Sequence, residues 1–186
     1  MILKNKKILC VCIFVGIFIC LSCRIWWVNK NARTPEIEIF RQGETVEYNG
    51  VGYTIENATM MEYNAFFEKY PEYKSYYNSS DYGRRMLLVE CVADKLSDEG
   101  EFDSYLPIRY EYVFNGIDPF MFRDMNPDLV EGTFKSGDTV LFVYEIYEEN
   151  LTKEQWDNVD ELDYYIVYGT YPKRTEVLLT DINEGD

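Results

Sequence analysis

The chain has 186 residues, of which 33 are acidic and 18 are basic, so its formal net charge at pH 7 is −15. This surplus of negative charge repels nucleic acid and anionic lipid headgroups, and we therefore expect no nucleic-acid partner. The sequence contains no histidine, which removes the side chain most often used as a general base near neutral pH.

The first 30 residues form the predicted membrane segment. The stretch from Ile8 to Val28 is apolar at nearly every position and follows Lys4, Lys6 and Lys7. At about 1.5 Å per residue this stretch makes a helix of roughly 31 Å, about the thickness of the hydrocarbon core of a bilayer. The basic start favours a cytoplasmic N-terminus, so we expect a single-pass protein of the cell membrane whose remaining chain lies outside the cell.

Two interpretations of this segment remain open. As a signal anchor, the helix ends with Trp26 and Trp27 at the outer interface, and Lys30 lies beyond them in water. As a cleaved lipoprotein signal, the segment ends at Cys23, which carries the lipid. The signal anchor is preferred, because Cys20 and Leu21 stand where a lipoprotein signal has a leucine and a small residue.

A polar linker at residues 31–36 leads to the predicted extracytoplasmic domain at residues 37–186. From residue 34 onward the chain has 12 basic and 33 acidic residues, a net charge of −21. Cys91 is the only cysteine in this part of the sequence, so we expect no intrachain disulfide there, which fits a bacterial surface protein. The length suffices for one hydrophobic core and not comfortably for two.

Alternation of apolar and polar residues predicts a series of short strands. The segments with this pattern are residues 37–41, 43–50, 51–61, 85–95, 106–114, 139–147, 162–171 and 175–180. Asn49-Gly50 is a strong hairpin signal between two of them. The segment 85–95 is apolar on most of both faces, which predicts a central strand with Cys91 in the core. Residues 181–186 are expected to be frayed.

Two helical segments interrupt the β pattern. Aromatic residues at helical spacing from Tyr63 to Tyr70, closed by Pro71, predict a short amphipathic helix over a sheet edge. Thr152 and Gln155 have the spacing of a capping box, which predicts a helical crossover before the penultimate strand.

Aromatic side chains in two segments are the candidate binding surface. Tyr73, Tyr76 and Tyr77 follow the first helix, and Phe120 and Phe122 lie in the long connection 116–132. Flat rings of this kind bind sugars or peptides at low entropic cost. The alternative, which we favour, is that these rings cover the core or plug an open end of it.

A dense acidic turn is the weak candidate for a metal site. Asp98, Glu99, Glu101 and Asp103 would supply carboxylate oxygens of the kind that calcium prefers. Their spacing fits no established calcium loop, and a solvated hairpin tip explains the same residues. We expect no cofactor.

Short strands, one large insertion and a helical crossover predict a mainly β chain with an immunoglobulin-like β-sandwich as its ectodomain. A β-barrel is the alternative. The segments Pro35–Tyr48, Tyr53–Ala58 and Arg85–Cys91, together with the basic signal anchor, resemble a family of uncharacterised single-span surface proteins of Gram-positive bacteria. That resemblance implies an immunoglobulin-like fold and contributes no catalytic residue.

The sequence favours a membrane-tethered extracytoplasmic binding module, with a protein or a cell-wall glycan as its partner. An accessory structural subunit of a cell-envelope complex is the alternative. A hydrolase that uses carboxylates or a metal is the weakest hypothesis, because no pair of carboxylates is singled out by a motif and Cys91 has no histidine to act as its base.

Overall fold

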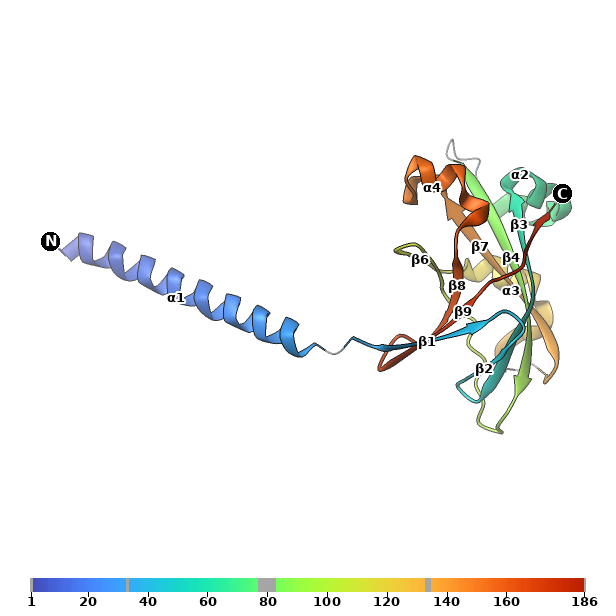
Figure 1. Cartoon of the computed structure of the whole chain (residues 1–186), viewed down its shortest axis with the longest axis horizontal. Coiled ribbons are helices and arrows are strands. Elements are labelled where there is room, and N and C mark those ends of the chain that lie inside the picture. The colour runs from blue at the N-terminus through green and yellow to red at the C-terminus, as the bar shows by residue number, and fades with distance from the viewer. Residues whose placement is uncertain (1, 33, 77–82, 133–134, 186) are drawn as a thin grey trace. The chain divides into compact units, whose positions relative to one another are not determined.

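The computed structural model of the chain describes residues 2–32, 34–76, 83–132 and 135–185. The chain divides into an N-terminal unit, residues 1–35, and a β-rich unit, residues 36–186. Helix α1 (Ile2–Asn31) fills most of the first unit, and its stretch from Ile13 to Asn31 is long and apolar enough to cross a membrane (Figure 1). The predicted N-terminal apolar helix is therefore present.

The β-rich unit contains two open sheets. The first sheet has the spatial order β1 (Glu36–Arg41), β9 (Lys173–Leu178), β8 (Tyr164–Tyr168), β5 (Ile108–Tyr110) and β6 (Val113–Asn115). Strand β1 is parallel to β9, and the other pairs are antiparallel. In the described part of the chain this sheet ends at β1 on one side and at β6 on the other, so the alternative of a closed barrel is wrong.

The second sheet has the order β10 (Ile182–Gly185), β3 (Val51–Glu62), β4 (Arg84–Lys95) and β7 (Asp138–Tyr147). Strand β2 (Thr45–Tyr48) pairs with the start of β3. The hairpin between them turns at Asn49 and Gly50, which have φ of 52° and 73°, as the Asn-Gly signal predicts. Strand β4 lies between β3 and β7, which confirms its central position.

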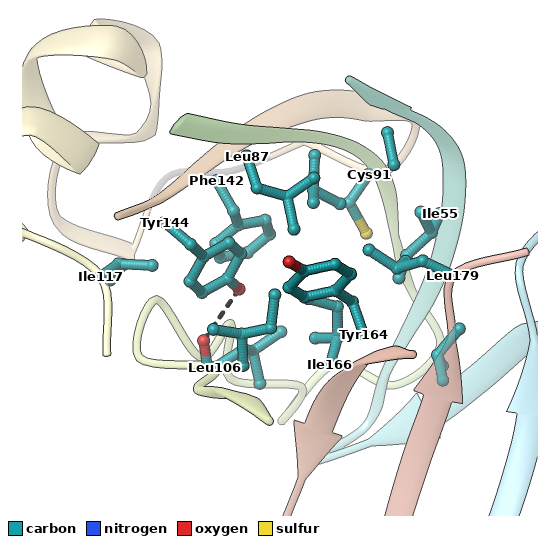
Figure 2. Packing of buried hydrophobic residues seen from close by; sticks show 14 of the residues in the cluster. Ile55, Leu87, Cys91, Leu106, Ile117, Phe142, Tyr144, Tyr164, Ile166 and Leu179 are labelled. Atoms are coloured by element: carbon teal, nitrogen blue, oxygen red, sulfur yellow. Dashed lines mark hydrogen bonds between the residues drawn. The ribbon is translucent and has the colours of Figure 1, made fainter. Parts of the chain in front are cut away.

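The main core lies between the two sheets. Leu87, Val89 and Cys91 of β4 belong to it and are at most 1% exposed, which confirms the predicted register. Figure 2 shows Leu87 and Cys91 among the side chains of this core. Aromatic residues from both sheets fill the centre of this core. The phenol of Tyr144 donates to the carbonyl oxygen of Leu106 at 2.9 Å, and this bond satisfies a hydroxyl that would otherwise be buried without a partner.

A second apolar cluster covers the outer face of the second sheet. It consists of side chains from β3, β4 and β7 and from two short helices, α2 (Tyr63–Lys69) and α3 (Pro119–Met125). The predicted helix at Tyr63 is confirmed, but it lies over the face of the sheet rather than over an edge, because Phe66 and Phe67 pack on Met61, Met86 and Leu88 of the sheet.

Three further segments differ from their predicted structure. Residues 106–114 form a hairpin instead of one strand, because Glu111 adopts a φ of 49° between β5 and β6. Residues 116–132 contain α3. The tail is strand β10 rather than a frayed end, since it pairs with Ala58–Met61 of β3, beyond the point where β2 stops.

The remaining elements are short. Helix α4 (Lys153–Asp157) has Thr152 as its N-cap, and the predicted capping box is present. The Thr152 side chain accepts from the N–H of Gln155, and the Gln155 side chain accepts from the N–H of Thr152. The described 3-10 helices are Pro71–Tyr76, Pro127–Gly132, Glu148–Asn150 and Val159–Glu161.

Candidate functional site

An arginine–glutamate ion pair lies beside two tyrosine rings on the outer face of the second sheet. Nη1 of Arg84 on β4 is 3.0 Å from Oε2 of Glu145 on β7. The Arg84 guanidinium is 5.2 Å from the ring centroid of Tyr63 and 5.1 Å from that of Tyr147, so cation–π attraction to both rings helps to hold it in place. The side chains of Arg84 and Glu145 are only 16% and 11% exposed, and this pair is therefore largely desolvated.

The carboxyl group of Glu145 is electrostatically perturbed. Burial raises the pKa of Glu145 above its usual value, and the negative charge of Asp118 adds to this effect. The hydrogen bond with Tyr147 and the charge of Arg84 lower the pKa but do not offset the burial. A positive charge placed beside Glu145 would stabilise its ionised form.

A pocket opens next to this ion pair, at the edge of β7. Its volume is about 390 Å³, and we call it the β7 pocket. It is lined by Asn115, Gly116, Ile117, Asp118, Pro119, Met121, Val143, Glu145 and Tyr147. Two of these residues are carboxylates and none is basic. Even with the adjacent Arg84 counted, the local net charge is −1, so the pocket favours a ligand that carries a positive charge.

Asp118, which lines the pocket, is the N-cap residue of helix α3. Its Oδ1 accepts hydrogen bonds from the backbone N–H groups of Phe120 at 2.8 Å and Met121 at 3.0 Å. Pro119 occupies the first turn, where the helix needs no N–H donor from it. The cap fixes one carboxylate oxygen of Asp118 in the protein, and its second oxygen has no hydrogen-bond partner within the described residues.

Two asparagine side chains bind the outer backbone edge of β7 on either side of Val143. The amide of Asn126 donates to the carbonyl oxygen of Leu141 and accepts from its N–H, both at 2.8 Å. The amide of Asn115 donates to the carbonyl oxygen of Glu145. Since alternate residues of an edge strand point outward, the N–H and C=O of Val143, between these two, face the pocket. The pocket thus combines a hydrogen-bonding strand edge with two carboxylates.

The aromatic residues predicted as a binding surface lie in different environments. Tyr73 is half-buried on the second cluster, and its phenol donates to the carbonyl oxygen of Asp124 at 3.2 Å. Phe122 packs in the main core, with its ring 5.4 Å from that of Phe142. Phe120 is 59% exposed on α3, two residues from Asp118. The side chain of Tyr76 and the whole of Tyr77 lie outside the described residues.

Backbone contacts with Gly50 hold the acidic turn after β4 in place. The carbonyl oxygen of Gly50 accepts from the N–H groups of Leu96 and Ser97, and a Cβ at Gly100 would lie only 2.4 Å from that same oxygen. Asp98, Glu99 and Glu101 are exposed on this turn, while Oδ1 of Asp103 accepts from the N–H of Tyr105 at 2.7 Å. Among the described residues no three acidic or cysteine side chains come close enough to hold a metal ion.

The two cysteines of interest differ in accessibility. Burial raises the pKa of the Cys91 thiol to about 12, so the thiolate needed for nucleophilic chemistry is not populated at neutral pH. Cys23 is exposed on α1, and its lipidation stays a prediction.

The residues of the β7 pocket were not identified from the sequence. Two signals were available. Asp118-Pro119 has the composition of a helix N-terminus, and Glu145 is a charged residue inside the apolar strand 140–147. Asn115 and Asn126 carry no such signal, because only the fold places them at the edge of β7.

No protein-family model, curated protein or solved structure matches the chain. The resemblance to an uncharacterised surface-protein family stays a prediction, and the function is argued from the site alone.

Proposed function

We propose that this protein is a membrane-tethered binding module whose domain lies outside the cell and whose β7 pocket takes a basic side chain of an extended peptide. The observation that carries the proposal is the Val143 backbone edge beside Asp118 and Glu145. A peptide backbone would hydrogen-bond to Val143 as an added strand, while its ammonium or guanidinium group would lie beside the two carboxylates.

We further propose that the domain is a variant of the immunoglobulin-like sandwich. The order β9-β8-β5-β6 corresponds to the strand order G-F-C-C′ of a variable-type sheet. The insertion of β4 between β3 and β7 is the main departure from that arrangement. Immunoglobulin-like domains serve many unrelated binding functions, so this correspondence supports the class of protein and not its ligand.

The orientation is tested by adding a protease to intact cells that carry the full-length chain. We expect the domain to be digested while a short N-terminal fragment survives in the membrane. Protection of the domain would overturn the outside location. A Cys23→Ala variant that keeps its membrane association and loses no lipid label would reject the lipoprotein interpretation.

The ligand class is tested with short acetylated and amidated peptides that differ only at one central residue. We expect peptides with a central lysine or arginine to bind at least about tenfold more tightly than those with norleucine, which corresponds to about 1.4 kcal/mol. Asp118→Asn should remove most of this difference without unfolding α3, because asparagine is an equally good N-cap. Equal binding of both peptides, or binding of glycan fragments instead, would contradict the proposal.

An accessory subunit of a cell-envelope complex is the second candidate. It is favoured by large apolar side chains on the strands and turns of the first sheet: Ile37, Ile39, Tyr112, Phe114 and Tyr171 are each at least 49% exposed. We do not propose a hydrolase, because Asp118 caps a helix and Glu145 is paired with Arg84.

A further inference from the structure

Strand β1 has an outer edge with unused hydrogen-bonding groups. The N–H of Gln42 donates to Leu178 of β9, which places alternate residues of β1 toward β9 and leaves Ile37, Ile39 and Arg41 pointing away. Glu44 occupies both backbone groups of Arg41, since its Oε2 accepts from the Arg41 N–H at 2.6 Å and its N–H donates to the Arg41 carbonyl at 3.0 Å. Within the described residues, the N–H and C=O groups of Ile37 and Ile39 remain without a partner.

The side chains of these two isoleucines lie on an uncovered face. Ile37 and Ile39 are 49% and 55% exposed. Ile39 is beside Glu176 of β9, which is fully buried and accepts from Nε and Nη2 of Arg109 at 2.8 and 2.7 Å. The buried carboxylate next to Ile39 is therefore already paired, and a partner that covers this isoleucine need not desolvate it as an unpaired charge.

The charge of the first sheet differs from that of the rest of the domain. Its five strands carry four basic residues and three acidic ones, a net charge of +1, whereas the chain from residue 34 onward carries −21. Two copies of such an acidic domain repel each other over most of their surfaces. The first sheet is the part of the surface where this repulsion is weakest.

We propose that the β1 edge is a homodimer interface, in which β1 of one copy pairs antiparallel with β1 of a second copy about a two-fold axis at Glu38. Ile37 of each copy then lies opposite Ile39 of the other, and every free N–H and C=O group of both edges is paired. Two other registers also bring the outward-facing residues opposite one another, but neither pairs all of the free N–H and C=O groups. Placing Ile39 opposite itself needs Arg41, whose groups Glu44 occupies. Placing Ile37 opposite itself sets Ile39 against Pro35, which has no N–H to donate to the Ile39 carbonyl.

The axis brings the two Glu38 side chains together, and each already has a counter-charge. Nζ of Lys173 lies 2.6 Å from Oε2 of Glu38, so the two carboxylates meet as neutralised pairs. The paired segment is short, so the contact area is below that of a stable soluble dimer. Confinement of both copies to one membrane raises their effective concentration, which favours a weak interface of this kind.

Cysteine cross-linking of the full-length chain in membranes tests the register. Single cysteines are placed at positions 36 to 40 in turn, in a chain whose Cys10, Cys12, Cys20 and Cys23 are changed to alanine. Because residues across the axis face each other at a separation that permits a disulfide, Glu38→Cys should cross-link at least about tenfold more than the positions on either side. Tyr112→Cys, 72% exposed at the turn between β5 and β6, is the control for random collision.

A second variant tests the backbone pairing itself. Ile37→Pro removes an N–H that points away from β9, so the pairing of β1 with β9 is retained. In the Glu38→Cys chain this change should lower the cross-linking yield by about tenfold, while Ile37→Val leaves it unchanged. A flat yield across positions 36 to 40, a yield at position 38 no higher than at Tyr112→Cys, or an unaffected yield in a folded Ile37→Pro chain would each overturn the proposal. Should the melting temperature show that Ile37→Pro does not fold, the position scan alone decides.

Discussion

Replacing Glu176 with glutamine removes a carboxylate that is paired with two arginines on the first sheet. Glu176 is fully buried and binds Arg109 through two charge-assisted hydrogen bonds, and Nε of Arg174 lies 3.0 Å from its Oε1. Glutamine keeps the shape and one acceptor oxygen but leaves two guanidinium groups close together without a counter-charge. Removing one partner of a buried ion pair costs about 3–5 kcal/mol.

The cost should fall at the lower end of that range. The side chains of Arg109 and Arg174 are 18% and 21% exposed, so water solvates part of their charge once the carboxylate is gone. We expect a loss of about 3 kcal/mol in the free energy of unfolding, which lowers the melting temperature by about 6–12 °C for a domain of this size. Urea unfolding followed by circular dichroism, with thermal melting in parallel, measures both quantities.

Glu38→Gln is the matched control on the neighbouring strand. It makes the same chemical change in a pair with Lys173 whose side chains are 44% and 48% exposed, and such pairs contribute about 0–1 kcal/mol. If Glu176→Gln destabilised the domain no more than Glu38→Gln does, the assignment of Glu176 as a buried ionic centre of the first sheet would be wrong.

Three further changes test other parts of the structure. Cys91→Ser should lower the free energy of unfolding by about 1–3 kcal/mol, because its hydroxyl enters an apolar core, and the native Cys91 thiol should react with a thiol reagent only after denaturation. Glu145 has a raised pKa in the folded state, so its contribution to stability falls as pH rises from its ordinary value of 4.5 through that raised pKa. Unfolding of wild type and Glu145→Gln at pH 4 to 7 should therefore show the stability of wild type decreasing relative to the variant, and an opposite trend would contradict the burial of the carboxyl. Sodium chloride should stabilise the domain by screening, with calcium chloride at equal ionic strength adding little, and a calcium effect lost in Asp98→Asn/Glu101→Gln would show that the acidic turn binds the ion.

The strands with strong local patterns were predictable from the sequence. The segment 85–95 is apolar on both faces, and it is β4, the central strand of the second sheet. Asn49-Gly50 and the capping box at Thr152 depend on neighbouring residues alone, and both are present as predicted. Such features follow from local chemistry, so they can be read without knowing which distant segments are neighbours.

Features that depend on distant partners were not predictable in the same way. Strand β10 has a polar sequence, Ile182–Gly185, and it is a strand because β3 extends beyond the end of β2 and offers it an edge. The hairpin at Glu111 interrupts an alternation that continues through it in the sequence. Helix α3 is the exception, since Asp118-Pro119 was a local signal of a helix start that the aromatic run after it obscured.

In the candidate site, too, some features follow from the local sequence and others depend on distant partners. Its charged residues stand out in the sequence only once β4 and β7 are known to be neighbours, because Arg84 and Glu145 are 61 positions apart. Asn126 is an ordinary loop residue in the sequence, yet its side chain serves as the hydrogen-bonding neighbour of Leu141. Residue type indicates the chemistry available, and the pairing of the strands decides where it is used.

The two parallel strand pairs have a consequence for when the domain is completed during synthesis. Strand β1 pairs with β9, and the end of β3 pairs with β10, so both contacts join the first strands to emerge with the last ones. Pairing over such long separations forms slowly, because the loop must close before the contact is made. Strand β1 therefore stays unpaired until nearly the whole chain has been made. Until then its exposed edges are open to aggregation, so the last two strands to form are also the ones that protect the first.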